Sequence, residues 1–121
     1  MQHHTKVYMD FFGYDQASWI PCEVCWAIAS GFVSGQLECN GTANAIHHVD
    51  ARGMGGDPTG EKDKATNLMA ICQAHHDFYG DKKQFMEFLY GIHIKKVVAR
   101  LAEIEQIIKH QRQLYRICHK P

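Results

Sequence analysis

The sequence lacks several features that would assign it to a broad class of protein. No apolar run reaches the roughly 18 residues that a membrane-spanning helix needs, so we expect no membrane partner. The N-terminal stretch MQHHTKVYMD has neither the basic nor the apolar region of a secretory signal, which predicts a cytoplasmic protein. The formal net charge is zero, with 13 basic and 13 acidic residues. This balance argues against holding nucleic acid by bulk charge alone, although it permits a local basic surface.

The chain has 121 residues, a length that suits a single domain over residues 1–121, and it divides into three zones. In the first zone, residues 1–20, Thr5 is expected to cap a short helix over KVYMDFF. Gly13 is expected to end that helix. We assign the apolar side chains of this helix to packing rather than to chemistry.

The second zone, residues 21–81, carries nearly all the unusual residues. Asn40-Gly41 is typical of a hairpin turn, and the segments ANAIHHV and NLMAIC are predicted to be strands. The polar, glycine-rich segment DARGMGGDPTGEKDKAT lies between them, and loops of this length are usually functional or disordered. QAHHDFYGD then predicts a short helix that Gly80 closes. The expected order is therefore strand, loop, strand, helix.

The third zone, residues 82–121, is predicted to be a helical extension. Its seam positions recur in steps of three and four, as in a heptad repeat, and Gly91 is expected to kink or break the helix before them. The seam consists of Ile94, Val97, Leu101, Ile104, Ile108, Gln111, Tyr115 and Cys118. This stripe either covers the core of its own domain or forms a homodimer by helix pairing, and the sequence leaves both possibilities open.

The five cysteines are an odd number, which in a cytoplasmic chain favours metal binding over disulfides. Cys22 and Cys25 form a Cys-x2-Cys pair, and Cys72 and His75 form a Cys-x2-His pair. Together they supply the Cys3His ligand set of a tetrahedral structural zinc. The alternative is a group of buried cysteines without metal. Two cysteines have no such partner, one expected in the hairpin and one in the helical seam: Cys39 and Cys118.

Two pairs of adjacent histidines frame the predicted strand–loop–strand–helix segment. His47 and His48 end a strand, where neighbouring side chains point to opposite faces. His75 and His76 lie on a helix, where neighbours differ by about 100°. If His75 faces the zinc, His76 can join one strand histidine in a second, open metal site, while the other strand histidine takes a proton from water. Metal-assisted phosphodiester hydrolysis uses this arrangement. We assign no role to the remaining histidines, His3, His4, His93, His110 and His119.

The segments HHVDARGMGG, NLMAIC and QAHH resemble the HNH nucleases, and specifically the zinc-containing branch in which a Cys-x2-Cys knuckle precedes the first histidine pair. They are also similar to phage-type members, including phage recombination-enhancement nucleases. The resemblance covers residues 21–81, about half the chain. It implies an α+β fold with a zinc-stabilised ββα-metal core, flanked here by a short N-terminal helix and a long C-terminal helix. It also implies a DNA endonuclease.

The resemblance further implies a role for each matched residue. His47 and His76 would bind the catalytic divalent metal, and His48 would be the general base. The amide of Asn67 would hold the loop and help to orient that base. The structural zinc would be held by Cys22, Cys25, Cys72 and His75.

Two positions depart from the family pattern. His75 replaces the usual cysteine, which zinc tolerates, so only zinc affinity is affected. Gly80 stands where some members carry a further metal ligand, which leaves Asp77 or Asp50 as candidates for a third ligand. Two protein ligands and several waters suit Mg²⁺, whereas imidazoles also suit Mn²⁺, Ni²⁺ or Zn²⁺. The sequence does not choose among these metals.

Three functional hypotheses remain open at this point. The first is a metal-dependent DNA endonuclease, in which Arg52 either grips the scissile phosphate with two hydrogen bonds or is a solvated loop residue. The second is a non-catalytic zinc-knuckle module that binds DNA or a protein. The third is a nuclease that needs a recombination or phage-packaging protein, because a chain of zero net charge is expected to bind DNA weakly by itself.

Overall fold

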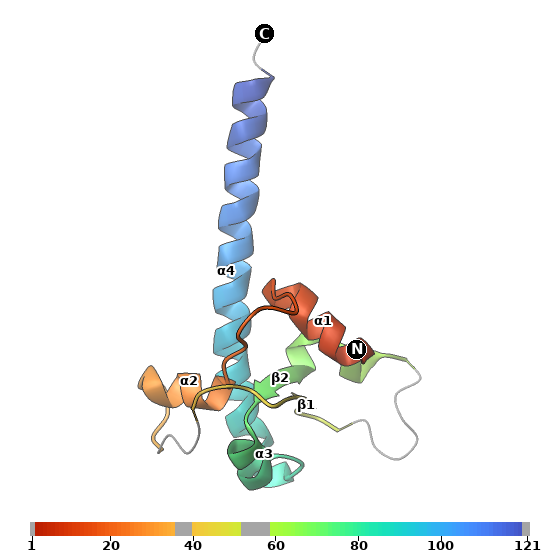
Figure 1. Cartoon of the computed structure of the whole chain (residues 1–121), viewed down its shortest axis with the longest axis vertical. Helices are drawn as coiled ribbons and strands as arrows, with labels where there is room; N and C mark the ends of the chain where they lie inside the picture. The colour runs from red at the N-terminus through yellow and green to blue at the C-terminus, as the bar shows by residue number, and fades with distance from the viewer. Residues whose placement is uncertain (1, 36–39, 52–58, 120–121) are drawn as a thin grey trace.

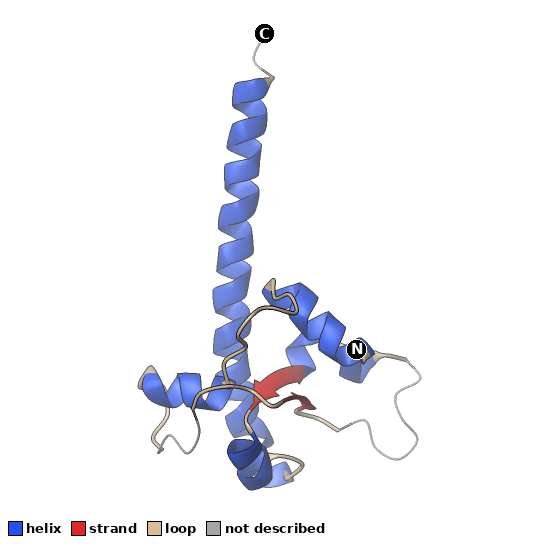
Figure 2. Cartoon of the chain, in the orientation of Figure 1, coloured by secondary structure: helices blue, strands red, loops and turns tan. Residues whose placement is uncertain are grey.

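The computed structural model describes residues 2–35, 40–51 and 59–119, which form an α+β arrangement of helices around one small sheet (Figures 1 and 2). In chain order its main elements are α1 (His3–Phe12), α2 (Glu23–Ala29), β1 (Ala45–His48), β2 (Leu68–Ile71), α3 (Gln73–Tyr79) and α4 (Met86–Cys118). Short 3-10 helices lie between them: η1 (Glu61–Asp63), η2 (Ala65–Asn67) and η3 (Lys83–Phe85). None of the described helices is both long and apolar enough to cross a membrane.

The two strands form an antiparallel pair in which Ala45 lies opposite Ile71. The predicted order of strand, loop, strand and helix is therefore present. Every residue of β2 is buried because helices cover both faces of the strand. Met69 and Ile71 pack into a core with α2 and α4, whereas Leu68 and Ala70 pack into a second core with α1. Alternation along the strand thus divides four consecutive apolar residues between two cores.

The N-terminal helix begins earlier than its sequence predicts. Thr5 lies inside α1, whose N-cap is Gln2, and no side-chain hydrogen bond caps this end. The added turn brings His4 against the ring of His48, at 4.6 Å between ring centroids, so tertiary packing replaces a local cap. Gly13 ends α1 as predicted, in the left-handed conformation with φ of 74°.

The turn at Asn40-Gly41 is present, and the residues expected to precede it in a hairpin, 36–39, lie outside the described residues. The Asn40 side chain accepts a hydrogen bond from the Thr42 amide at 3.0 Å, and Gly41 has a φ of 85°. Thr42 then pairs with Pro21 in an isolated bridge. This bridge lies next to the start of α2. The sequence analysis did not predict α2.

A buried polar network joins the two cores. The Glu23 carboxylate accepts hydrogen bonds from the Tyr8 hydroxyl at 2.7 Å and from the Ala70 amide at 2.9 Å. His93 Nδ1 lies 2.7 Å from the same carboxylate, and His93 Nε2 lies 2.6 Å from the Ala65 carbonyl. Burial alone lowers the pKa of His93, but its contacts with Glu23 and Ala65 outweigh this and raise the pKa. His93, to which the sequence assigned no role, therefore ties α4 to α1, α2 and β2.

Helix α4 runs unbroken through Gly91, so the expected kink or break there is wrong. Leu89, Ile92 and His93 are buried on either side of this glycine, and their packing outweighs its cost of about 1 kcal/mol. The first turns of α4 thus complete the core, and Val97 is its last buried residue. The remainder of α4 rises away from the other elements (Figure 1).

Candidate metal centre and its surroundings

Four buried side chains converge where α2 and α3 begin. Cys22 is the N-cap of α2 and accepts a hydrogen bond from the Cys25 amide, while Cys72 is the N-cap of α3 and His75 lies in its first turn. Nδ1 of His75 lies 3.7 Å from Cys22 Sγ, 3.4 Å from Cys25 Sγ and 3.3 Å from Cys72 Sγ. The predicted Cys3His group is therefore assembled in the folded chain.

The geometry of this group suits a structural Zn²⁺. Tetrahedral zinc with typical Zn–S and Zn–N bond lengths places sulfur and nitrogen ligands about 3.6 Å apart. The three observed separations, from 3.3 to 3.7 Å, bracket that value. Burial of all four side chains also agrees with a closed structural site rather than with an open catalytic one.

A second group of potential metal ligands includes His76, the neighbour of His75 on α3. His47 of β1 and His76 of α3 face each other with ring centroids 4.8 Å apart. Asp81 joins them, and the potential ligand atoms of the three residues all lie within 4.8 Å of one another. Among the described residues, His47 Nε2 is a buried side-chain atom with no hydrogen-bond partner. A buried, unpaired nitrogen facing a histidine and a carboxylate fits an open metal site.

The acidic member of this group differs from both expected candidates. Asp77 is held by the Gln73 amide at 2.7 Å, and Asp50 pairs with Lys62. Asp81 takes the place instead, with its carboxylate 4.0 Å from His76 Nε2. Gly80 explains why, because a Cβ there would lie 2.5 Å from the His76 carbonyl oxygen. No side chain fits at that position, so the next residue supplies the carboxylate.

Burial also affects the protonation of His47. Its pKa is lowered, first by burial and then by the neighbouring His76, whereas Asp81 acts in the opposite direction. A lowered pKa keeps the imidazole neutral near pH 7, which is the form that binds a metal.

His48 occupies different surroundings from His47, as alternation on a strand requires. Its Nε2 lies 2.7 Å from Asp63 Oδ1, and its ring packs against His4. Sequence analysis missed both partners. Asp63 lies in the polar loop, and His4 precedes the predicted N-terminal helix and was given no role, so no local pattern marked either residue.

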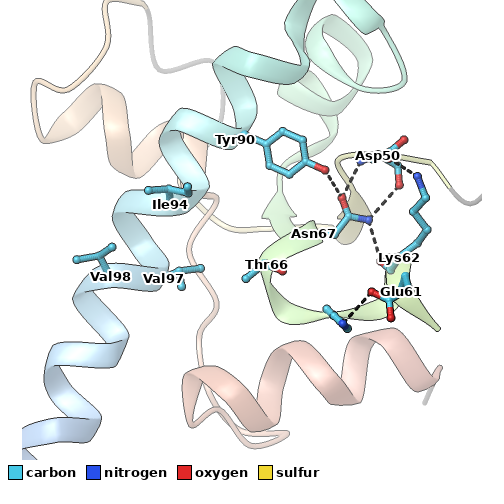
Figure 3. Close-up of a pocket in the computed structure, with 10 residues that line it drawn as sticks. Asp50, Glu61, Lys62, Thr66, Asn67, Tyr90, Ile94, Val97 and Val98 are labelled. Carbon is cyan, nitrogen blue, oxygen red and sulfur yellow. Dashed lines mark hydrogen bonds and ion pairs between the residues drawn. The ribbon is translucent and has the colours of Figure 1, made fainter. Parts of the chain in front are cut away.

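Asn67 ties the two ends of the long loop to the sheet. Its Oδ1 accepts hydrogen bonds from the Asp50 amide at 2.8 Å and from the Tyr90 hydroxyl at 2.7 Å. Its Nδ2 donates to the carbonyls of Asp50 at 3.0 Å and Lys62 at 2.8 Å. Figure 3 shows this amide at the centre of these contacts. These hydrogen bonds fix the backbone at both ends of the loop, and Asp63 follows directly after Lys62.

A groove of about 690 Å³ opens beside this loop (Figure 3). Polar residues of the loop form one wall, and Tyr90 and an apolar strip of α4 form the other. Its lining comprises Asp50, Glu61, Lys62, Lys64, Thr66, Asn67, Tyr90, Ile94, Val97 and Val98. The two lysines of this wall are each paired with a carboxylate of the same wall, Lys62 with Asp50 and Lys64 with Glu61. The predicted phosphate contact Arg52, like Cys39, lies outside the described residues.

Comparisons with family models, curated proteins and solved structures find no match to this chain. A functional proposal therefore depends on the geometry of the side chains.

Proposed function

We propose that this protein is a metal-dependent DNA endonuclease of the HNH type, with a zinc-stabilised ββα-metal core. The observation that carries the proposal is the pairing of His47 and His76 across β1 and α3, with the His47 nitrogen buried and unpaired. This pair lies apart from the Cys3His group. The two members of each adjacent histidine pair therefore belong to different groups. A structural module alone needs only the zinc group and gives no reason for the second one.

In this proposal His47 and His76 hold the catalytic metal, with Asp81 as the third protein ligand. A divalent cation bound there supplies positive charge to the scissile phosphate and to the leaving oxygen. The mixed nitrogen and oxygen ligand set suits Mn²⁺, Ni²⁺ or Zn²⁺ as well as Mg²⁺. Structural zinc remains in the separate Cys3His group.

His48 is the general base. Its Nε2 lies against the Asp63 carboxylate, which is an acceptor, so the ring proton is held on Nε2. This tautomer leaves Nδ1 unprotonated and able to take a proton from the attacking water. Asp63 is therefore a positioning residue for the base, and the Asn67 amide fixes the loop segment that precedes it.

Lysines of the groove wall contact the phosphates of a DNA substrate by exchanging their carboxylate partners, Asp50 and Glu61, for phosphate oxygens. Lys62 and Lys64 line the groove, which runs from the loop towards α4. Because the whole chain carries no net charge, these two local contacts give weak intrinsic affinity, which salt lowers further. A recombination or packaging protein that delivers DNA would relieve this weakness, so activity with and without such a partner is part of the proposal.

The test is nicking of supercoiled plasmid in Mg²⁺, Mn²⁺, Ni²⁺ or Zn²⁺, with EDTA as the negative control. Wild type is expected to nick in at least one metal, and His48→Ala is expected to lower the rate by about 10²–10⁴-fold, the usual contribution of a general base. His110→Ala, an exposed histidine on α4, is the matched control and should nick normally. One tightly held zinc without any metal-dependent nicking would favour the non-catalytic zinc module instead.

A further inference from the structure

Beyond the zone that packs on the core, α4 carries a stripe of apolar side chains exposed to solvent. Arg100 makes the last hydrogen bond from α4 to another described element, donating from Nε to the Phe11 carbonyl at 2.8 Å. After it, large apolar residues are 43% to 64% exposed. They are Leu101, Ile107, Ile108, Leu114, Tyr115 and Ile117. The possibility that the seam covers only its own domain's core is therefore wrong beyond Arg100.

A helical segment with an exposed apolar face lacks the main source of helix stability. Most helical stability in proteins comes from packing an apolar face rather than from intrinsic propensity. Within the described part of the chain, the projecting part of α4 has only local support, such as the exposed ion pair between Lys109 and Glu105 at 3.2 Å. Such a pair contributes about 0.3–0.5 kcal/mol, which is too little to hold the segment. A partner helix is needed.

The charges along the projecting segment identify that partner as a second copy running in the opposite direction. Glu103 and Glu105 outweigh Lys109 in its first half, whereas Arg112 and Arg116 are the charged residues of its second half. Antiparallel pairing places each acidic half against a basic half, whereas parallel pairing places like against like. In a twofold dimer each such contact occurs twice.

We propose that the protein forms an antiparallel homodimer through residues 101–118 of α4, with the twofold axis between Lys109 and His110. In this alignment the seam pairs are Leu101 with the partner's Cys118, Ile104 with the partner's Tyr115, and Ile108 with the partner's Gln111. The overlap begins just after Arg100, where α4 leaves the core. The paired length of the two helices is about 27 Å.

The positions that flank the seam support the same alignment. On one flank Glu105 meets the partner's Arg112, which is an attractive pair. On the other flank Ile107 meets the partner's Leu114, which extends the apolar contact. A parallel in-register dimer would instead place Ile107 beside the partner's Arg112, an apolar residue against a charge. The antiparallel dimer avoids this contact between an apolar and a charged side chain on its flanks.

The first experiment is sedimentation equilibrium of the full chain over a wide range of concentration. A monomer–dimer equilibrium is expected for wild type. Ile108→Glu buries a charge twice in the interface and is expected to raise the dimer Kd by more than about a hundredfold. Gln113→Glu adds the same charge on the opposite side of the helix and is the matched control. A wild-type monomer at every concentration would overturn the proposal.

The second experiment distinguishes the two orientations. Glu105→Arg and Arg112→Glu are each expected to weaken the dimer, and the double variant should restore it because the flank pair is only reversed. A double variant that stays as weak as the single variants contradicts the antiparallel register. Mild oxidation of Leu101→Cys should give a dimer cross-linked to the native Cys118. Removing Cys118 from that variant should abolish the cross-link, and efficient cross-linking of wild type through Cys118 alone would show a parallel dimer.

Discussion

Replacing Glu23 by alanine tests the buried network that joins the two cores. The carboxylate is fully buried and has three partners: the Tyr8 hydroxyl, the Ala70 amide and the His93 imidazole. Removing it leaves a buried imidazolium without its counter-charge and two further donors without an acceptor. Breaking a buried charge pair from one side costs about 3–5 kcal/mol, so we expect the free energy of unfolding to fall by about 4 kcal/mol. That is a large part of the roughly 5–15 kcal/mol that stabilises a domain.

The assay is urea unfolding followed by circular dichroism, with zinc held at a fixed concentration. Glu61→Ala removes an exposed carboxylate that pairs with Lys64, and its effect should stay within about 0.5 kcal/mol. Should Glu23→Ala not fold, Tyr8→Phe removes a single donor and is expected to cost about 1.5–3 kcal/mol. Losses below about 1 kcal/mol for both Glu23→Ala and Tyr8→Phe would refute the reasoning.

Three further predictions concern the zinc, His93 and the loop. Cys72→Ser should lose most of its bound zinc by elemental analysis, while Cys118→Ser should retain it. The folded-state pKa of His93 is raised, so its stabilising contribution is complete below about pH 6.5 and is lost as pH rises through that pKa. The stability advantage of wild type over His93→Gln should therefore shrink as pH rises, and a growing advantage would contradict the ion pair. Asn67→Ala should lower stability by about 2–3 kcal/mol and speed hydrogen exchange at the Asp50 amide; unchanged exchange would argue against its anchoring role.

Much of the fold was predictable because its signals are local. Short apolar runs bounded by turn residues marked both strands, and the x2 spacing of cysteine and histidine marked the zinc group before any contact was known. Gly13 ended its helix for a purely backbone reason. The start of α1 and the continuity of α4 were mispredicted because tertiary packing at His4 and around Gly91 outweighed weak local preferences.

The candidate site was predictable only in part. Alternation on β1 and rotation on α3 correctly separated the members of each histidine pair. Asp63, Asp81 and His4 could not be found from the sequence, because their spacing from the histidines does not predict where they lie in space. Asp81 further depends on a steric exclusion at Gly80, which is visible only once the backbone of α3 is placed.

Measuring metal binding and nicking in the same samples of His48→Ala tests the proposed nuclease most directly. The account predicts that this variant keeps its zinc and still binds Mn²⁺ at His47 and His76, as measured by electron paramagnetic resonance, while its nicking rate falls by about 10²–10⁴-fold. His76→Ala should lose both Mn²⁺ binding and nicking. Wild-type nicking rates in a metal-bound His48→Ala protein would contradict the central claim.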